Sequence, residues 1–250
     1  MKIFATYNIK GGVGKTSTAV NLAYLSAREG RRTLLWDLDP QAAATFLFRV
    51  RPRVKGGGHG LVSGKRPIEA ALKATDFDNL DLLPADFSYR NMDLELDDAK
   101  KRTRRLGQLL DGFADDYDVV FLDCPPSISL MSENVLHAAD TLLVPLIPAT
   151  LSLRTFDQLR TFVADSAKPR PEVVAFFSMA DRRKRLHRDV IEEFDRDGAG
   201  VAQTVIPALS IIEQMAERRA PVPAFAPLSR AALWLASSRR GNVEFHSALW

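Results

Sequence analysis

The chain has 250 residues, of which 46% are hydrophobic and 26% charged, so it can bury one sizeable core and is not disordered along its whole length. Lysine and arginine exceed aspartate and glutamate by 34 to 31, a small basic excess whose meaning depends on where the charges lie. The single cysteine, Cys124, excludes an intrachain disulfide framework and a cysteine-rich metal cage, which favours a cytoplasmic location.

Short apolar runs alternate with helix-length segments along the chain. Runs rich in β-branched and aromatic residues predict buried strands at residues 3–7, 33–36, 80–83, 119–122, 141–147, 173–178 and 201–206. Helical spacing occurs at residues 16–28, 89–113, 153–165, 186–195, 211–219 and 229–238. This alternation predicts one α/β domain over residues 1–250, with a mostly parallel twisted sheet and helices on both faces. No stretch has the roughly 18 to 20 uncharged apolar residues of a membrane span, so no integral membrane association is expected.

The first predicted strand leads into a glycine-rich segment and then a helix. The segment reads Lys10-Gly11-Gly12-Val13-Gly14-Lys15-Thr16-Ser17. Glycines let backbone N–H groups turn toward an anion, and the helix N-terminus adds its positive dipole end. We therefore predict a P-loop that binds ATP, with Lys15 at the β- and γ-phosphates and the Thr16 hydroxyl on Mg²⁺.

One departure from the general P-loop pattern is itself informative. Ile9 stands where the first glycine belongs, and Lys10 supplies a second lysine. The segment thereby resembles the deviant Walker A motif of the ParA/MinD family of ATPases, and most closely ParA-type partition ATPases that lack an N-terminal DNA-binding domain. The resemblance implies a P-loop NTPase fold and an ATP-dependent sandwich homodimer in which Lys10 and Lys15 are both catalytic, Lys10 acting on the partner's nucleotide. The resemblance to this family extends over most of residues 1–235.

The segment after the second strand, Asp37-Leu38-Asp39-Pro40-Gln41, resembles the family's first switch. A carboxylate at the carboxyl end of a parallel strand faces the ligand crevice, so Asp39 is expected to orient the attacking water and Asp37 to support the metal. The family usually continues with Gly-Asn, whereas this chain has Ala42-Ala43, which predicts a stiffer switch and affects hydrolysis more than nucleotide binding. A helix-capping turn at Asp39 is a second interpretation, compatible with the first.

The apolar run at residues 119–122 ends in Asp123, the pattern of a Walker B element that holds Mg²⁺ through a water molecule. The residues that follow, Cys124-Pro125-Pro126-Ser127, resemble the family's second switch, and Cys124 is expected to be a buried, unreactive thiol. The resemblance also places the adenine beside Met179, Asp181 and Pro207.

Two basic regions stand out. Residues 49–67 combine glycines and positive charge with little to bury, which favours a mobile surface loop over a dedicated binding element. The densest cationic cluster comprises Arg182, Arg183, Lys184, Arg185 and Arg188, with Arg218 and Arg219 further along. Such side chains neutralise phosphates without reading bases, so the sequence predicts non-specific DNA binding, the alternative being a solvated helix face. No helix-turn-helix precedes the P-loop, so sequence-specific binding is not expected.

The resemblance implies a molecular switch. The ATP-bound dimer would associate with the nucleoid, and slow hydrolysis, stimulated by an adaptor of ParB type, would partition or position a plasmid, a chromosome or a protein assembly. One alternative is a MinD-like ATPase on a membrane, but Gly241 would end the faintly amphipathic C-terminal helix and the tail lacks a basic face. Another is a metabolic P-loop ligase of the dethiobiotin or cobyrinate kind. An iron–sulfur reductase is excluded because its cluster needs two cysteines per subunit.

Overall fold

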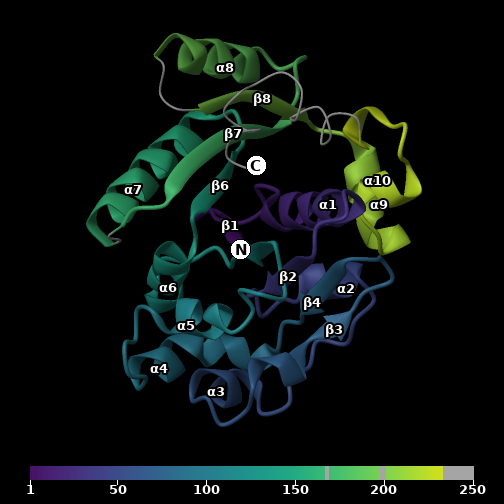
Figure 1. Cartoon of the computed structure of the whole chain (residues 1–250). Coiled ribbons are helices and arrows are strands. Elements are labelled where there is room, and N and C mark those ends of the chain that lie inside the picture. The colour runs from purple at the N-terminus through teal and green to yellow at the C-terminus, as the bar shows by residue number, and fades with distance from the viewer. Residues whose placement is uncertain (167–168, 198–200, 233–250) are drawn as a thin grey trace.

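The computed structural model describes residues 1–166, 169–197 and 201–232, and its centre is an eight-stranded sheet (Figure 1). The strand order is β3-β4-β2-β5-β1-β6-β7-β8. The strands are β1 (Lys2–Thr6), β2 (Thr33–Asp37), β3 (Lys73–Ala74), β4 (Leu80–Leu83), β5 (Val119–Asp123), β6 (Thr141–Leu146), β7 (Glu172–Ala180) and β8 (Val201–Pro207). Neighbouring strands pair in parallel except at the edge, where β3 runs antiparallel to β4. The predicted mostly parallel α/β sheet is confirmed.

Helices cover both faces of this sheet. They are α1 (Lys15–Arg28), α2 (Ala43–Leu47), α3 (Gly57–Val62), α4 (Met92–Asp97), α5 (Arg105–Asp111), α6 (Leu130–Ala138), α7 (Thr150–Ser166), α8 (Arg185–Asp197), α9 (Ser210–Arg218) and α10 (Val222–Phe225), with 3₁₀ turns at Ile68–Ala71 and Phe87–Asn91. No helix in the described part of the chain is long and apolar enough to cross a bilayer.

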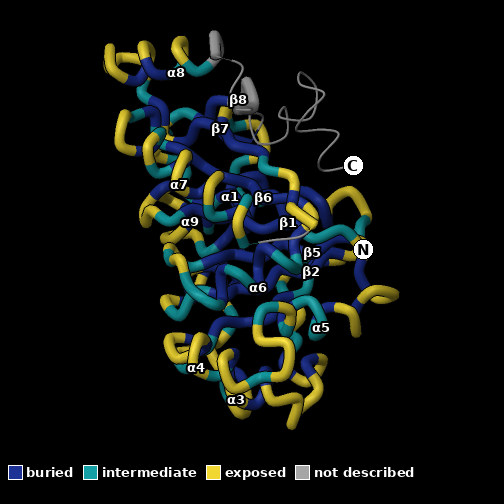
Figure 2. The backbone as a smooth tube through the Cα atoms, turned by 90° about the vertical axis from the view of Figure 1, so that its left-hand side faces the viewer, coloured by how far each residue is buried: buried dark blue, intermediate teal, exposed yellow. Residues whose placement is uncertain are grey.

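Two hydrophobic layers form because side chains alternate along the central strands. On β5, Val119 and Phe121 pack toward α1, α2, α9 and α10, whereas Val120 and Leu122 pack toward α3 to α8. Both layers are closed to solvent, so the buried backbone runs through the middle of the molecule and the exposed residues lie outside it (Figure 2). The strands are therefore apolar on both sides, as their near-continuous hydrophobic runs predict.

The predicted helix over residues 89–113 is wrong, because the structure divides it into a 3₁₀ turn, α4 and α5. The Asn134 side chain on α6 donates to Arg102 O at 2.6 Å and accepts from Leu106 N at 3.1 Å. A continuous helix would need those backbone groups for its own hydrogen bonds. Lys101 also has φ +58°, in the left-handed region, which interrupts the helix between the two pieces.

Residues 49–67 differ from the loop expected there. They contain α3, and Val54, Leu61 and Val62 are buried in the core. Asp86 accepts a hydrogen bond from Val54 N at 2.8 Å, and Ser88 Oγ accepts one from Gly58 N at 2.8 Å. The few apolar residues of this stretch therefore anchor it, while its cations remain exposed; these are Arg49, Arg51, Arg53, Lys55, Lys65 and Arg66.

Part of the predicted C-terminal helix at residues 229–238, and the whole tail at 241–250, lie outside the described residues.

Candidate functional site

The glycine-rich segment forms an open loop between β1 and α1. Gly12 and Gly14 have φ of +70° and +98°, conformations that glycine adopts without strain, and a β-carbon at Gly14 would lie 3.0 Å from Ser178 Oγ. Asn8 fixes the start of the loop by donating to Pro145 O at 2.8 Å and accepting from Lys10 N at 2.9 Å. Helix α1 begins without a side-chain cap, which leaves backbone N–H groups at its first turn available to an anion.

The two lysines of the loop differ in environment. Lys15 is buried and its Nζ donates to Lys10 O at 3.1 Å. Burial lowers the pKa of Lys15, and the charges of Asp123 and Asp39 oppose that shift. Lys10 is exposed at the mouth of the loop. The charge of the buried lysine therefore interacts with the carboxylates of Asp123 and Asp39, while the other lysine of the loop is exposed to solvent.

Asp37 ends β2 and is fully buried. Its Oδ2 accepts from Thr45 N at 2.8 Å and Thr45 Oγ1 at 2.7 Å, and its Oδ1 accepts from Asp39 N at 3.2 Å. Burial raises the pKa of Asp37 to about 6, with the Thr45 hydrogen bonds acting against the rise. The carboxyl group thus holds α2 against the sheet, a role the sequence analysis missed, while its role beside the metal stays a prediction.

Asp123 ends β5 beside Asp37 and offers an unused oxygen. Its Oδ1 accepts from Thr6 Oγ1 at 3.4 Å, but its buried Oδ2 has no hydrogen-bond partner among the described residues. Burial raises the pKa of Asp123 well above its usual value and the Asp37 charge adds to this, whereas the nearby Thr16 hydroxyl and the Lys15 charge lower it. A buried, under-coordinated carboxylate near a hydroxyl suits a hard cation such as Mg²⁺.

Within the described residues, no group of three or more His, Cys, Asp or Glu side chains is arranged to hold a metal ion. Protein ligands alone would therefore not complete an octahedral Mg²⁺ shell here. Mg²⁺ characteristically takes one or two protein oxygens and completes its shell with substrate phosphates and water, so Thr16 and Asp123 fit that partial set.

Asp39 lies at the turn that leads into α2. Its Oδ1 accepts from Gln41 N at 2.9 Å and its backbone O accepts from Ala42 N at 2.8 Å, which closes a turn before α2. The N-cap of α2 is Ala42 and no side chain caps the helix, so the second interpretation, a helix cap at Asp39, is wrong. Ala42 has φ +58°, where the resembled family has glycine. A left-handed backbone costs a non-glycine residue roughly 1–2 kcal/mol, so the backbone at Ala42 is strained in this turn.

The second switch packs against the loop. Pro126 lies 3.9 Å from where a β-carbon of Gly11 would stand. Cys124 is 1% exposed, and burial raises the pKa of its thiol well above the usual value. The predicted burial of this thiol is confirmed, and its protonated state makes it a poor nucleophile.

A cavity of about 260 Å³ adjoins the start of α1. Met179 and Pro207 line it, as expected for the base, together with Gly14. Asp181 is not among its lining residues: its carboxylate accepts from Arg183 Nε at 3.1 Å, and its N–H donates to His187 Nδ1 at 3.0 Å. The structure therefore turns Asp181 toward the start of α8 and away from the cavity.

Other lining residues of this cavity were missed by the sequence analysis. They include Asn21, Ser178, Ile212 and Glu213. Asn21 stands one helical turn after Ser17 on α1, a spacing that could have placed it on the same face. The lining residues on α9 could not be recognised from the local sequence, because their position depends on how α9 packs against α1.

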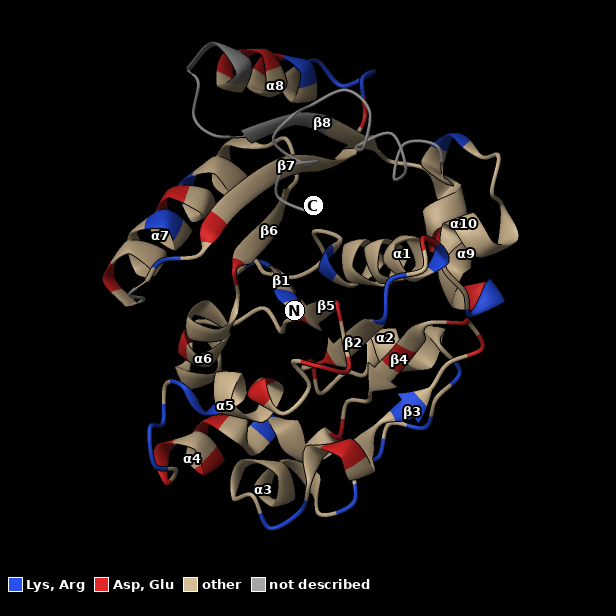
Figure 3. Cartoon of the chain, viewed as in Figure 1, with Lys and Arg blue, Asp and Glu red and all other residues tan. Residues whose placement is uncertain are grey.

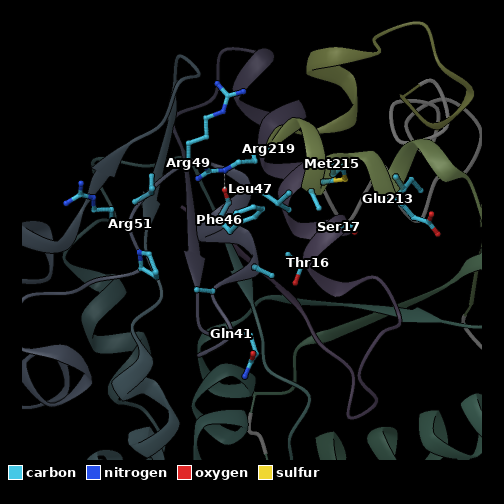
Figure 4. Close-up of a pocket in the computed structure, with 16 residues that line it drawn as sticks. Thr16, Ser17, Gln41, Phe46, Leu47, Arg49, Arg51, Glu213, Met215 and Arg219 are labelled. Atoms are coloured by element: carbon cyan, nitrogen blue, oxygen red, sulfur yellow. Dashed lines mark hydrogen bonds between the residues drawn. The ribbon is translucent and has the colours of Figure 1, made fainter.

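A second hollow, of about 910 Å³, opens on the other side of Thr16 and Ser17 (Figure 4). Side chains of α2 and α9 form its walls, among them Phe46 and Met215. Ser17 lines both this hollow and the smaller cavity. The start of α1 therefore borders two spaces, one lined by Met179 and Pro207 and one lined by Gln41 and α2.

The predicted DNA-contacting cations do not form one patch. Figure 3 shows those of α8 at the top of the molecule, apart from the end of α9. Arg183 pairs with Asp181 and Arg185 with Asp189, at 3.1 and 3.5 Å. The remaining cations of the cluster are exposed and have no ion pair within the described chain: Arg182, Lys184 and Arg188. At the other location, Arg219 binds Phe46 O at 3.0 Å, while Arg218 is exposed.

Known proteins are similar to this chain over most of its length. A family model described as an AAA domain matches residues 1–172. The sporulation initiation inhibitor protein Soj of Bacillus subtilis is 33% identical over 239 residues, 92% of this chain and 94% of Soj. The chromosome partitioning protein ParA of Caulobacter vibrioides is 35% identical over 215 residues, 83% of this chain and 80% of that protein.

Solved structures with the same architecture include two differently named proteins. Cobyrinic acid a,c-diamide synthase from Mycobacterium smegmatis, with bound ATP analog and magnesium, has a TM-score of 0.77 and 31% identity and covers 87% of this chain and 91% of its own. The cell division ATPase MinD of Pyrococcus furiosus has a TM-score of 0.79 and 23% identity, covering 100% and 99%, a likeness that concerns the fold.

Proposed function

We propose that the chain, which belongs to the ParA/MinD-type ATPase family, is a partition or positioning switch. It binds ATP with Mg²⁺, forms a homodimer in the ATP state and associates non-specifically with DNA in the cytoplasm. Slow hydrolysis, stimulated by an adaptor of ParB type, then releases the dimer and moves a cargo. The names of its relatives, a chromosome partitioning protein among them, support this reading.

The observation that carries the proposal is that the buried Asp123 Oδ2, at the end of β5, has no hydrogen-bond partner among the described residues. Phosphoryl transfer needs positioning and charge neutralisation more than a separate base. Lys15 and the N–H groups at the start of α1 would hold the triphosphate. Mg²⁺, held by Thr16 and through water by Asp123, would supply neutralisation of the phosphate charge. Asp39, on the turn after β2, would orient the attacking water.

Lys10 supports the proposed dimer. It is exposed next to the exposed Gly11 and Gly12, so this face of the loop is open to another molecule. A second copy docked on that face would meet the lysine directly. Its charge would then act on the nucleotide of the other subunit, which makes hydrolysis depend on assembly.

DNA binding is proposed to use cations that have no ion-pair partner in the part of the chain that the structure describes. Arg182, Lys184 and Arg188 meet that condition on and before α8, and Arg218 is exposed at the end of α9. Arg183 and Arg185 are partly neutralised by their own aspartates, so their share of phosphate contact should be smaller.

Retention on non-specific duplex DNA tests the switch and its surface together. The measurement compares ATP, ADP and no nucleotide, with the oligomeric state followed by light scattering in the same samples. We expect a dimer and DNA retention with ATP alone. Equal retention in all three conditions, or none in any, would contradict the proposal.

A metabolic ligase is the second candidate. It is favoured by the 31% identity to a structure named cobyrinic acid a,c-diamide synthase, and the 910 Å³ hollow beside Thr16 has room for a second substrate. Its test is ADP release that requires a cobyrinate-type carboxylic acid and an amide-nitrogen donor. Release at the same rate without the acid rejects the ligase.

A further inference from the structure

Helices α2 and α9 are fastened together at one end, although they lie far apart in the sequence (Figure 4). Arg219 Nε donates to Phe46 O at 3.0 Å, and its guanidinium carbon lies 4.5 Å from the centroid of the Phe46 ring. Arg49 Nη2 donates to Arg218 O at 3.1 Å. These contacts, which we call the α2–α9 clasp, give Arg218 O a donor and add a second donor to Phe46 O, which also accepts from Arg49 N at 3.1 Å.

Two residues of the clasp have left-handed backbones. Arg49 has φ +61° and Arg219 has φ +50°. Neither is a glycine, so each conformation costs roughly 1–2 kcal/mol and persists only because surrounding contacts hold it. Both strained residues take part in the α2–α9 clasp. Strain of this kind suggests that the position of the chain at the clasp is important for function.

Helix α2 is too short to set its own position. It has five residues, Ala43–Leu47, far below the roughly 12 that an isolated helix needs. From the inside, Thr45 holds it through two hydrogen bonds to Asp37 at 2.7 and 2.8 Å, and Thr45 Oγ1 also accepts from Ala85 N at 2.9 Å. From the outside, the Arg219 side chain holds its last turn.

The turn that carries Asp39 is continuous with this helix. Ala42 N donates to Asp39 O at 2.8 Å, and Phe46 N donates to Ala42 O at 2.9 Å. A displacement of Phe46 would therefore be passed back to Asp39 within a few residues. The same hollow that the clasp borders is lined by Thr16 and Gln41, so the clasp and the phosphate end of the site are two sides of one space.

We propose that Arg219 is a positioning residue for ATP hydrolysis: through its contacts with Phe46 it fixes α2, and thereby the orientation of Asp39 toward the phosphate site. The inference rests on the proposed ATPase function and adds a residue to it. It also reassigns Arg219, which the sequence analysis placed at DNA. Its guanidinium already has an acceptor and an aromatic ring, while Arg218 is free to meet phosphates.

The test uses the full chain and the variants Arg219→Ala and Arg219→Lys, with Gln214→Ala, an exposed position on the same helix, as the matched control. Initial rates are measured over a range of Mg-ATP concentrations without DNA, and Mg-ADP affinity is measured by calorimetry. We expect Arg219→Ala to lower kcat about five- to tenfold, with KM and ADP affinity changed less than about twofold. Arg219→Lys should recover part of kcat, since it keeps the charge and a donor but loses the planar group that stacks on Phe46.

Amide hydrogen exchange provides the second readout. In Arg219→Ala, residues 43–47 should exchange faster, while α1 keeps its protection. A global loss of stability would accelerate both, and that result would overturn the inference. So would a wild-type kcat in Arg219→Ala, or a loss of ADP affinity as large as the loss of kcat.

The two hypotheses fail differently. If the wild-type chain hydrolyses ATP and Arg219→Ala does so equally well, the clasp has no role in positioning and the proposed function stands. If the wild-type chain does not hydrolyse ATP even with DNA and a cognate adaptor present, the proposed function fails and this inference fails with it.

Discussion

Asp37 and Asp123 are register partners at the carboxyl ends of the adjacent parallel strands β2 and β5, and both are fully buried. The Asp37 charge raises the pKa of Asp123, so the two carboxyl groups destabilise each other's ionised forms. Lys15 is a nearby cation that opposes this effect on Asp123. The site therefore places two carboxyl groups near a loop suited to phosphate. Binding of a metal–nucleotide complex would reduce the repulsion between these two groups.

Removing the Lys15 side chain should abolish most nucleotide affinity. Lys15→Ala deletes the ammonium that would face the β- and γ-phosphates, and a charge-assisted hydrogen bond contributes roughly 1.5–3 kcal/mol. We expect Mg-ATP to bind about 10- to 100-fold more weakly by calorimetry. Unchanged affinity would show that residues 10–16 are not a P-loop.

Lys10→Ala should separate binding from assembly. The Lys10 side chain is exposed, so its loss should leave the loop of its own subunit intact and the monomer should bind nucleotide with wild-type affinity. ATP-dependent dimerisation, measured by light scattering, and turnover should both weaken. A fully dimeric Lys10→Ala chain in ATP would show that this lysine does not act across the interface.

Asp39→Ala should trap the ATP state. The water-orienting carboxylate is lost, whereas Lys15, Thr16 and Asp123 still hold the nucleotide. Turnover should fall about 100-fold or more, the scale of a lost general-base or water-positioning group, and DNA retention in ATP should persist. Wild-type turnover would transfer the role to another residue, Asp37 being the first to test.

Stability without nucleotide should fall as the pH rises. Burial raises the pKa of Asp37 from 3.8 to about 6, so between those values the folded chain binds a proton that the unfolded chain has released. The contribution is fully present below about pH 4 and is lost above pH 6, amounting to about 3 kcal/mol at roughly 1.4 kcal/mol per pKa unit. Asp37→Asn keeps an oxygen acceptor for Thr45 and should remove this dependence in urea unfolding series from pH 4 to 7. Parallel curves for the two chains would contradict the raised pKa of the buried Asp37.

The unpaired cations on and before α8 should dominate DNA contact. Reversing Arg182, Lys184 and Arg188 to Glu should remove ATP-dependent DNA retention and leave ATP binding intact. Neutralising the three to Gln should lower the salt slope of log K by about 3, near 0.9 for each phosphate contact. Arg183→Gln with Arg185→Gln is the matched comparison and should have a smaller effect, since both side chains are paired. Equal effects of the two sets would refute the distinction.

The phosphate site could be predicted from sequence because its signals are local. Glycines, a lysine and a threonine follow an apolar strand within a few residues, and the continuous apolar run at residues 119–122 ends directly in Asp123. Thr45 could not be linked to Asp37, since that hydrogen bond depends on how α2 folds back onto the sheet. The break between α4 and α5 was likewise hidden, because Asn134 imposes it from about 30 residues downstream. For Asp181, the family resemblance placed the residue beside the adenine. In the structure its carboxylate instead accepts a hydrogen bond from Arg183.

The state of Cys124 has a practical consequence for following this protein in solution. It is the chain's one cysteine, it is buried, and its thiol stays protonated at neutral pH. Maleimide dyes react with accessible thiolates, so the folded native chain should take up almost no label. A cysteine introduced at the exposed Gln158 on α7 would then carry a fluorophore without any prior removal of the native thiol. Energy transfer between labelled copies could report association and separation during single turnovers.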